Sequence, residues 1–212
     1  MVTGVVFDVG ETLVDDTREW RVWADWLGVP AHTVSALVGA VTARGLDNVE
    51  ALRLIKPDFD LAAERALREE AGRGERIEEA DLYPDVRPAL SALRKAGLWV
   101  GVAGNQTARA AELLGALDLP VDEIATSGQW GVAKPDPRFF SRVIDWAPGD
   151  PHEIVYVGDY CFHDIVPAKA IGLRAALIRR GPWGYLWADD QECPADWRIA
   201  GLNELPDLFT RS

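Results

Sequence analysis

The feature of this chain that most constrains its fold is the alternation of short apolar runs with helix-like segments in its second half. Including one apolar run near the N-terminus, the predicted strands lie at residues 5–7, 98–103, 123–126, 154–157 and 175–178. The predicted helices lie at residues 86–95, 107–117, 138–145 and 165–171. Strands that alternate with helices predict parallel βαβ units, with helices on both faces of the sheet. We therefore predict an α/β fold with a Rossmann-like, three-layer core and a parallel sheet.

A different pattern separates the first predicted strand from the others. Between residues 15 and 83, apolar side chains such as Trp20 and Trp23 recur at helical spacing, and no segment is convincing as a strand. We interpret residues 15–83 as an inserted helical cap domain, and residues 1–14 and 84–212 as the core. Ligands of such sheets bind at the carboxyl ends of the strands, so we expect the cap to cover that end as a lid.

The part of the chain between residues 183 and 197 is rich in Trp, Pro and acidic residues. It shows no clear periodicity, and we predict a surface loop or the edge of the lid. Trp20, Trp23 and Trp26 lie three residues apart and therefore drift around a helix. Packing between cap helices is their expected role, and an apolar contact with the substrate is the alternative.

Charge and hydropathy limit the partners and the location. The formal net charge is −12 at pH 7, which disfavours nucleic acid and anionic membranes as partners. A phosphate site would have to be a local pocket of positive potential. The N-terminus lacks the features of a signal peptide, and no apolar run approaches the roughly 20 residues of a membrane span. We predict a cytoplasmic protein; its oligomeric state cannot be predicted.

The chain has two cysteines, Cys161 and Cys193, without CxxC spacing. A disulfide framework and a structural zinc site are both improbable on this pattern. We expect Cys161 to be a small buried side chain and not a nucleophile.

Polar residues follow several of the predicted strands, and they are the candidates for catalysis and metal binding. They are Asp8, Asn105, Lys134 and Asp159, with Asp164 a little further along the chain. In a parallel sheet these positions meet at one edge. Carboxylates from separate strands make a site suited to Mg²⁺, and a lysine beside them supplies the positive charge that phosphate oxygens need. A carboxylate next to both groups can attack phosphorus and form an acyl phosphate.

On these motifs the sequence resembles the haloacid dehalogenase superfamily, in particular its phosphatase-like members with a helical (C1-type) cap after the first strand. The resemblance covers nearly the whole chain. The matching segments are Asp8-Val9-Gly10-Glu11-Thr12-Leu13, Asn105, Lys134-Pro135-Asp136-Pro137, and Gly158-Asp159 followed by Asp164. Each motif is short, and the order and placement of all of them carry the resemblance.

The resemblance implies a role for each matching residue. Asp8 is the expected nucleophile, and Lys134 the residue that balances the charges of nucleophile and phosphate. Asn105 is expected to orient the substrate, and Thr12 to support the loop around it. The expected Mg²⁺ ligands are Asp8, the backbone carbonyl of Gly10, Asp159 and Asp164. For Asp164, ligation, support of a ligand and capping of the following helix all stay open.

Two positions depart from the family pattern. Gly10 stands where the phosphatases carry a second aspartate that acts as general acid and base, and Gly104 stands where they carry Ser or Thr. General acid–base catalysis contributes about 10² to 10⁴ in rate, so we expect a weak or specialised phosphatase that favours good leaving groups. Glu11, or Asp15 and Asp16 at the entry to the cap, are the possible substitutes, although solvated or capping carboxylates are the simpler interpretation.

Two other functions stay open. Both glycines are compatible with a catalytically silenced relative that binds a phosphorylated ligand or a partner protein. A 2-haloacid dehalogenase-like hydrolase is the second alternative, but that chemistry needs no metal, and the pair Asp159 and Asp164 argues against it. His163 lies between these two aspartates, and because Mg²⁺ prefers oxygen we expect it to be a neighbour and not a ligand.

Overall fold

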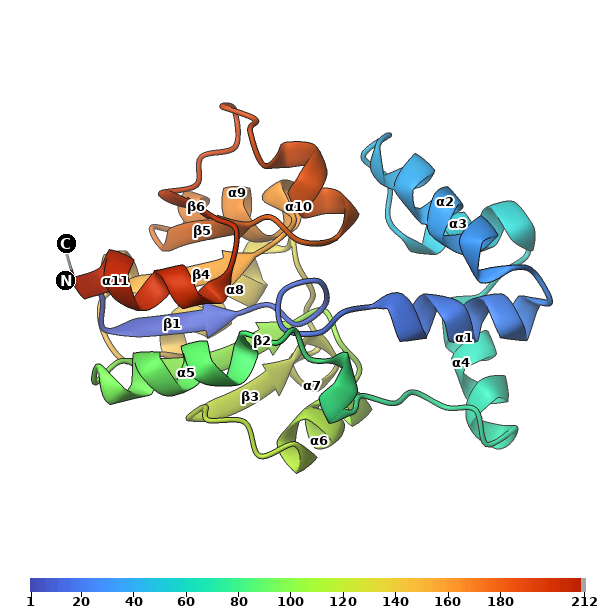
Figure 1. The fold of residues 1–212 in the computed structure, drawn as a ribbon, viewed down its shortest axis with the longest axis horizontal. Coiled ribbons are helices and arrows are strands. Elements are labelled where there is room, and N and C mark those ends of the chain that lie inside the picture. The colour runs from blue at the N-terminus through green and yellow to red at the C-terminus, as the bar shows by residue number, and fades with distance from the viewer. Residues whose placement is uncertain (211–212) are drawn as a thin grey trace. The chain divides into compact units, whose positions relative to one another are not determined.

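The computed structural model describes residues 1–210, and these residues form two compact units (Figure 1). The core unit consists of residues 1–15 and the chain from Glu78 onward, and the helical unit consists of residues 16–77. The predicted cap, residues 15–83, contains the whole helical unit. Its action as a cap stays a prediction.

The core unit is built on a six-stranded sheet in the order β3-β2-β1-β4-β5-β6, in which every neighbouring pair is parallel. The strands are β1 (Gly4–Phe7), β2 (Trp99–Gly104), β3 (Glu123–Thr126), β4 (Ile154–Gly158), β5 (Arg174–Ile178) and β6 (Trp197–Ile199). Every residue of β1 and β4 is buried, as expected for central strands covered by helices on both faces. The predicted α/β fold is confirmed.

The helices of the core unit follow the strands in alternation. They are α5 (Val86–Lys95), α6 (Ala108–Ala116), α7 (Ser127–Trp130), α8 (Pro137–Trp146), α9 (Val166–Ala170), α10 (Gly181–Trp187) and α11 (Leu205–Thr210). Short 3₁₀ turns lie at Glu79–Asp81, Pro151–Glu153 and Leu202–Glu204, and a π-helical turn lies at Cys161–Ile165. Helices α5 and α11 pack against each other (Figure 1). Phe139, Phe140 and Val143 of α8 pack in a cluster with Val6 and Tyr156 of the central strands.

The prediction of a surface loop or lid edge at residues 183–197 is wrong at both ends, where regular elements lie, whereas residues 188–196 form turns and bends. Helix α10 occupies Gly181–Trp187, and Trp197 begins β6. Trp183 and Cys193 are buried. The Gly-Pro start provides proline in the first turn of the helix, where its missing N–H is tolerated. A helix of seven residues and a strand of three are too short for their periodicity to stand out.

The helical unit contains α1 (Thr17–Leu27), α2 (Ala31–Thr42), α3 (Val49–Ile55) and α4 (Leu61–Glu70). Trp23 lies in its core, 2% exposed, with its ring edge against Phe59 at 5.3 Å between centroids. The guanidinium group of the buried Arg68 lies over the Trp23 ring, 4.1 Å from its centre. The expected packing role is confirmed for this tryptophan. Among residues 1–210, no helix has the length and apolar character needed to cross a membrane.

Candidate active site

The polar residues singled out in the sequence come together at the carboxyl edge of the central strands. Asp8 directly follows β1, Asn105 directly follows β2, and Asp159 directly follows β4. Because these strands are adjacent and parallel, their ends bring the three residues to the same edge. Lys134 reaches this edge from the loop between α7 and α8, and Asp164 from the π-helical turn.

The Lys134 ammonium group lies between two carboxylates. Its Nζ is 2.7 Å from Asp8 Oδ1 and 2.6 Å from Asp164 Oδ1, and its side chain is 3% exposed. Burial alone would lower the pKa of Lys134, but the Asp164 and Asp8 carboxylates outweigh burial and raise it well above its usual value. The lysine is therefore a fixed positive charge inside an acidic protein. Because three carboxylates surround this one cation, Lys134 alone does not make the local pocket of positive potential expected for a phosphate group, and a bound cation would have to supply further positive charge.

Three carboxylates form the other half of the site. Asp8, Asp159 and Asp164 are buried and place oxygen atoms within 4.8 Å of one another. Burial, opposed by the charge of Lys134, raises the pKa of Asp8 to about 6. Burial and the neighbouring carboxylates raise the pKa of Asp159 well above its usual value. One oxygen, Oδ2 of Asp159, is buried without a hydrogen-bond partner in the described part of the chain.

This arrangement fits a hard divalent cation. A cation would relieve the repulsion among the carboxylates and would satisfy the unpartnered Asp159 oxygen. The oxygen-only donor set suits Mg²⁺ better than a softer metal. The aromatic ring of His163 stacks on Tyr160, with 4.1 Å between centroids, and the cluster of potential ligands contains no histidine among residues 1–210.

Lowering the pH below about 6 is expected to weaken Mg²⁺ binding. If Asp8 ligates the metal as predicted, a proton would compete for its carboxylate, because the pKa of Asp8 is raised to about 6. Apparent affinity should fall about tenfold per pH unit below that value. The raised pKa also affects the free energy of folding of the metal-free protein. The stabilising contribution of Asp8 is fully present below about pH 4, where its carboxyl group is protonated, and is lost as the pH rises through about 6. Calorimetric Mg²⁺ titrations of wild type and Asp8→Asn across this range test the expectation, and a pH-independent wild-type affinity would contradict it.

Asp164 is fixed by its own hydrogen bonds. Oδ1 faces Lys134, and Oδ2 accepts the Tyr160 backbone N–H at 2.9 Å. The following helix α9 receives no side-chain cap. The helix-cap interpretation is therefore not supported, whereas ligation of a metal and orientation of Lys134 both stay compatible with the geometry.

Asn105 forms a reciprocal pair with the backbone of Lys134. Its Nδ2 donates to the Lys134 carbonyl at 2.9 Å, and its Oδ1 accepts the Lys134 N–H at 2.8 Å. The amide thus fixes the segment that delivers the ammonium group. The expected contact of Asn105 with substrate stays a prediction.

Residues 8–14, which we call the nucleophile loop after the predicted role of Asp8, turn back on themselves after β1. The Val9 carbonyl accepts the N–H groups of Leu13 at 2.8 Å and Val14 at 2.9 Å. Thr12 is fully buried, and its Oγ1 has no hydrogen-bond partner among the described residues. Gly10 pairs with Val14 in an isolated bridge. The expected substrate-side role of Thr12 and metal-ligand role of the Gly10 carbonyl stay predictions.

The glycine at position 104 is explained by a close approach. A Cβ atom there would lie 2.5 Å from Oδ1 of Asp8 and 3.2 Å from Cγ2 of Val9. Glycine therefore leaves room for the Asp8 carboxylate against the end of β2. A Ser or Thr at this position would require the Asp8 side chain to rotate away from its present place.

Glu11 is held away from a free acid–base role. Its Oε2 accepts a hydrogen bond from the Tyr83 hydroxyl, and its side chain lies against Gly181, where an added Cβ atom would collide with it.

Three residues near the site, Tyr83, Tyr156 and Arg180, were not recognised in the sequence. The Tyr156 hydroxyl donates to the Ala103 carbonyl at 2.7 Å. A tyrosine within an apolar strand gives no signal of such a contact.

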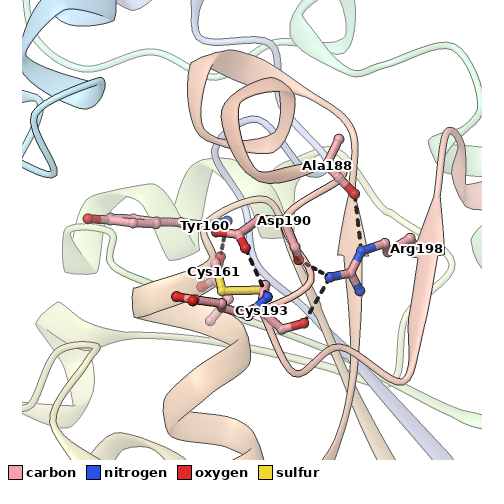
Figure 2. The surroundings of a disulfide bond; sticks show 8 residues. Tyr160, Cys161, Ala188, Asp190, Cys193 and Arg198 are labelled. Carbon is pink, nitrogen blue, oxygen red and sulfur yellow. Dashed lines mark hydrogen bonds between the residues drawn. A yellow bond between two sulfur atoms is a disulfide. The ribbon is translucent and has the colours of Figure 1, made fainter.

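Cys161 and Cys193 form a disulfide, so the expectation that the cysteine pattern carries no disulfide framework is wrong for this one pair (Figure 2). The cysteines are 32 residues apart, and their Cα atoms are separated by 5.9 Å. Helix α10 and the segment after it bring Cys193 to the π-helical turn that carries Cys161, which no local spacing indicates. Arg198 donates to the carbonyls of Ala188 at 3.1 Å and Cys193 at 2.8 Å, which fixes one end of the bridge.

Removing this disulfide is expected to lower the free energy of unfolding by about 3 to 4 kcal/mol, because the bridge closes a loop of this length in the unfolded chain. Denaturant unfolding of oxidised and dithiol-reduced wild type measures the difference. The double variant Cys161→Ala/Cys193→Ala is the control and should not respond to the reductant. Equal unfolding midpoints for oxidised and reduced wild type would contradict the expectation.

Comparison with known proteins identifies the family of this chain. The family of haloacid dehalogenase-like hydrolases matches residues 2–172. The chain is 29% identical to a phosphoserine phosphatase of Thermus thermophilus over 86% of this chain and 76% of the relative. It is 33% identical to a glyceraldehyde 3-phosphate phosphatase of Methanopyrus kandleri, over 59% of this chain and 55% of that relative. The chain thus spans about half the length of the second relative.

The solved structures give the same fold. A haloacid dehalogenase-like hydrolase from Bacteroides fragilis aligns over 97% of this chain and 100% of its own, with a TM-score of 0.72 and 23% identity. The chain belongs to the haloacid dehalogenase-like hydrolase family. The resemblance seen in the sequence motifs is therefore confirmed, and with it the class of hydrolase with phosphatase relatives.

Proposed function

We propose that this protein is an Mg²⁺-dependent phosphatase that hydrolyses a small phosphorylated molecule through an aspartyl-phosphate on Asp8. The observation that carries the proposal is the buried Lys134 held between Asp8 and Asp164, beside the unpartnered oxygen of Asp159. Phosphoryl transfer depends mainly on positioning and charge neutralisation, and this cluster supplies both.

In the first step, an Asp8 carboxylate oxygen attacks phosphorus, the bond to the leaving oxygen breaks, and an aspartyl-phosphate forms. Lys134 neutralises the charge that collects between the carboxylate and the phosphate oxygens. Asn105 keeps Lys134 in place through its two bonds to the lysine backbone. Asp8, Asp159, Asp164 and the Gly10 carbonyl would hold Mg²⁺, which supplies further charge neutralisation when bound.

In the second step, water attacks phosphorus and the Asp8 carboxylate leaves, which releases phosphate. Gly10 has no side chain to take the proton of this water or to protonate the leaving oxygen in the first step. We therefore propose that aryl and acyl phosphates, whose leaving groups need little protonation, are better substrates than alkyl phosphates. Slow hydrolysis should also allow the phosphoenzyme to accumulate.

Gly10→Asp is expected to raise turnover of an alkyl phosphate by about 10² or more, with a smaller effect on an aryl phosphate. The new carboxyl group supplies the proton that an alkoxide leaving group needs. Steady-state rates with matched aryl and alkyl phosphates measure the change. Gly10→Asn is the control, since it has a similar size but cannot donate a catalytic proton. Equal rates for the Asp and Asn variants would contradict this role for position 10.

A second candidate is a silenced relative that binds a phosphorylated ligand without hydrolysing it. Gly10 and Gly104, both at the reacting centre, favour this candidate. The intact Asp8, Lys134 and Asp159 argue against it. Dehalogenase chemistry is the less favoured alternative because it makes no use of a three-carboxylate cluster.

We also propose that residues 15–83 form the helical cap that selects the substrate, and that the protein is cytoplasmic. The four helices of the helical unit support the first proposal. The Cys161–Cys193 disulfide argues against the second, because disulfides are more typical of oxidising compartments. Fractionation of cells that produce the protein, with thiol labelling, tests the location and the state of the cysteines together.

A further inference from the structure

A buried arginine, Arg180, donates a hydrogen bond to the backbone of the nucleophile loop. Arg180 lies just after β5, and its side chain is 9% exposed. Its Nη1 donates a hydrogen bond of 2.7 Å to the backbone carbonyl of Thr12. Thr12 belongs to the same tight turn as Asp8, so the guanidinium group is attached to the backbone that carries the proposed nucleophile.

The orientation of Arg180 is fixed by residues outside the loop. Asp85 forms an ion pair with it at 2.5 Å, and the Asp85 carboxylate also accepts the Leu202 backbone N–H at 2.8 Å. The Tyr83 ring lies under the guanidinium group, 4.2 Å from ring centre to Cζ. A buried cation with a carboxylate, an aromatic face and a carbonyl as partners has one well-defined orientation.

Tyr83 gives the loop a second attachment. Its backbone N–H donates to the Leu13 carbonyl at 3.0 Å, and its hydroxyl donates to the Glu11 carboxylate. Glu11 has a φ of 53°, a left-handed conformation that non-glycine residues rarely adopt. Such a conformation persists when neighbouring groups hold it. Here the hydrogen bonds from Tyr83 to Glu11 and Leu13, and from Arg180 to Thr12, hold the loop in this conformation.

We propose that Arg180 is a positioning residue for phosphoryl transfer, and that it acts through the Thr12 carbonyl to fix the Asp8 loop. This inference rests on the proposed phosphatase function. Arg180 does not contact the reacting groups. Its loss should therefore leave substrate binding nearly intact and should slow the step in which Asp8 attacks phosphorus, because a displacement of about 1 Å at a reacting group costs about 10² in rate.

The test uses Arg180→Met and Arg180→Lys, with Arg87→Met as the matched control. Like Arg180, Arg87 pairs with a carboxylate, Glu79 at 2.7 Å, and donates to backbone carbonyls, those of Leu117 and Asp118, although its side chain is more exposed, at 38%. None of these partners lies in the nucleophile loop. Arg180→Lys keeps a cation beside Asp85 and is the variant to use if Arg180→Met does not fold.

We expect Arg180→Met to lower kcat for an aryl phosphate by about 10- to 100-fold with KM changed by less than about threefold. Arg180→Lys should fall between wild type and Arg180→Met, and Arg87→Met should keep the wild-type kcat. Wild-type kcat in both Arg180 variants, or an equal loss in Arg87→Met, would overturn the inference.

Amide hydrogen exchange separates this inference from the proposed function. Exchange at residues 9–14 should rise at least about tenfold in both Arg180 variants and should not rise in Arg87→Met. If wild type shows no turnover that depends on Asp8, the proposed function fails, and the exchange data alone decide whether Arg180 fixes the loop. Unchanged exchange at residues 9–14 in the Arg180 variants would overturn the positioning role.

Discussion

Asp8→Asn is expected to abolish phosphatase turnover, by at least about 10⁴-fold, while the protein stays folded. An amide cannot attack phosphorus to give an acyl phosphate that water then hydrolyses. The substitution keeps the shape of the side chain and removes one charge from a group of three buried carboxylates. Hydrolysis of an aryl phosphate with Mg²⁺ and with EDTA, followed for both proteins, measures the effect.

The unfolding temperature of Asp8→Asn distinguishes a loss of catalysis from a loss of folded protein. The raised pKa of Asp8 means that its charged form is disfavoured in the metal-free protein, so asparagine should not lower the unfolding temperature near pH 7. Asp145→Asn, at an exposed aspartate of α8, is the control and should keep full activity. Turnover by Asp8→Asn within about tenfold of wild type would exclude Asp8 as the nucleophile.

Lys134→Met is expected to be the most destabilising single change in the site and also to reduce turnover strongly. Removal of the ammonium group leaves Asp8 and Asp164 buried without their cation, which typically costs about 3 to 5 kcal/mol. It also removes the charge that faces the attacking carboxylate, so we expect kcat to fall by about 10² to 10³. Chemical unfolding and steady-state kinetics measure the two effects.

The control for Lys134→Met is Lys169→Met. Lys169 pairs with Asp196 at 2.8 Å, but the two side chains are 30% and 26% exposed, so this pair should contribute less than about 1 kcal/mol. If Mg²⁺ binds these carboxylates as proposed, saturating Mg²⁺ should recover part of the stability of Lys134→Met, because it would bind the folded state and neutralise the same charges. Equal unfolding free energies for the two lysine variants would contradict the expectation that Lys134 stabilises the fold by pairing with the buried carboxylates of Asp8 and Asp164.

The central part of the fold and the site was predictable because both depend on short-range patterns. A buried apolar run followed by Asp8 or Asp159 indicates a strand and the residue at its end, and parallel pairing then brings the ends together. The sequence pattern also placed Lys134 and Asp164 at this edge. The pattern did not indicate the hydrogen bonds among these residues, such as the two that join the Asn105 amide to the backbone of Lys134.

The features that the sequence did not reveal depend on contacts between distant segments. Arg180 reaches the Thr12 carbonyl across 168 positions, and an arginine after a strand carries no periodic signal of such a bond. Cys161 and Cys193 pair because α10 turns the chain back, and α10 itself is only seven residues long. Periodicity detects an element by its repeated burial, so short elements and single long-range contacts escape it.

Phosphorylation of Asp8 during turnover is tested most directly by trapping the aspartyl-phosphate intermediate. Wild type is mixed with an aryl phosphate and Mg²⁺, quenched in acid, digested and analysed by mass spectrometry. We predict a peptide that contains Asp8 with the added mass of one phosphoryl group. This phosphorylated peptide should be absent from Asp8→Asn and more abundant in wild type than in Gly10→Asp. Turnover of the substrate by wild type with no phosphorylated Asp8 peptide at any time of quenching would contradict it.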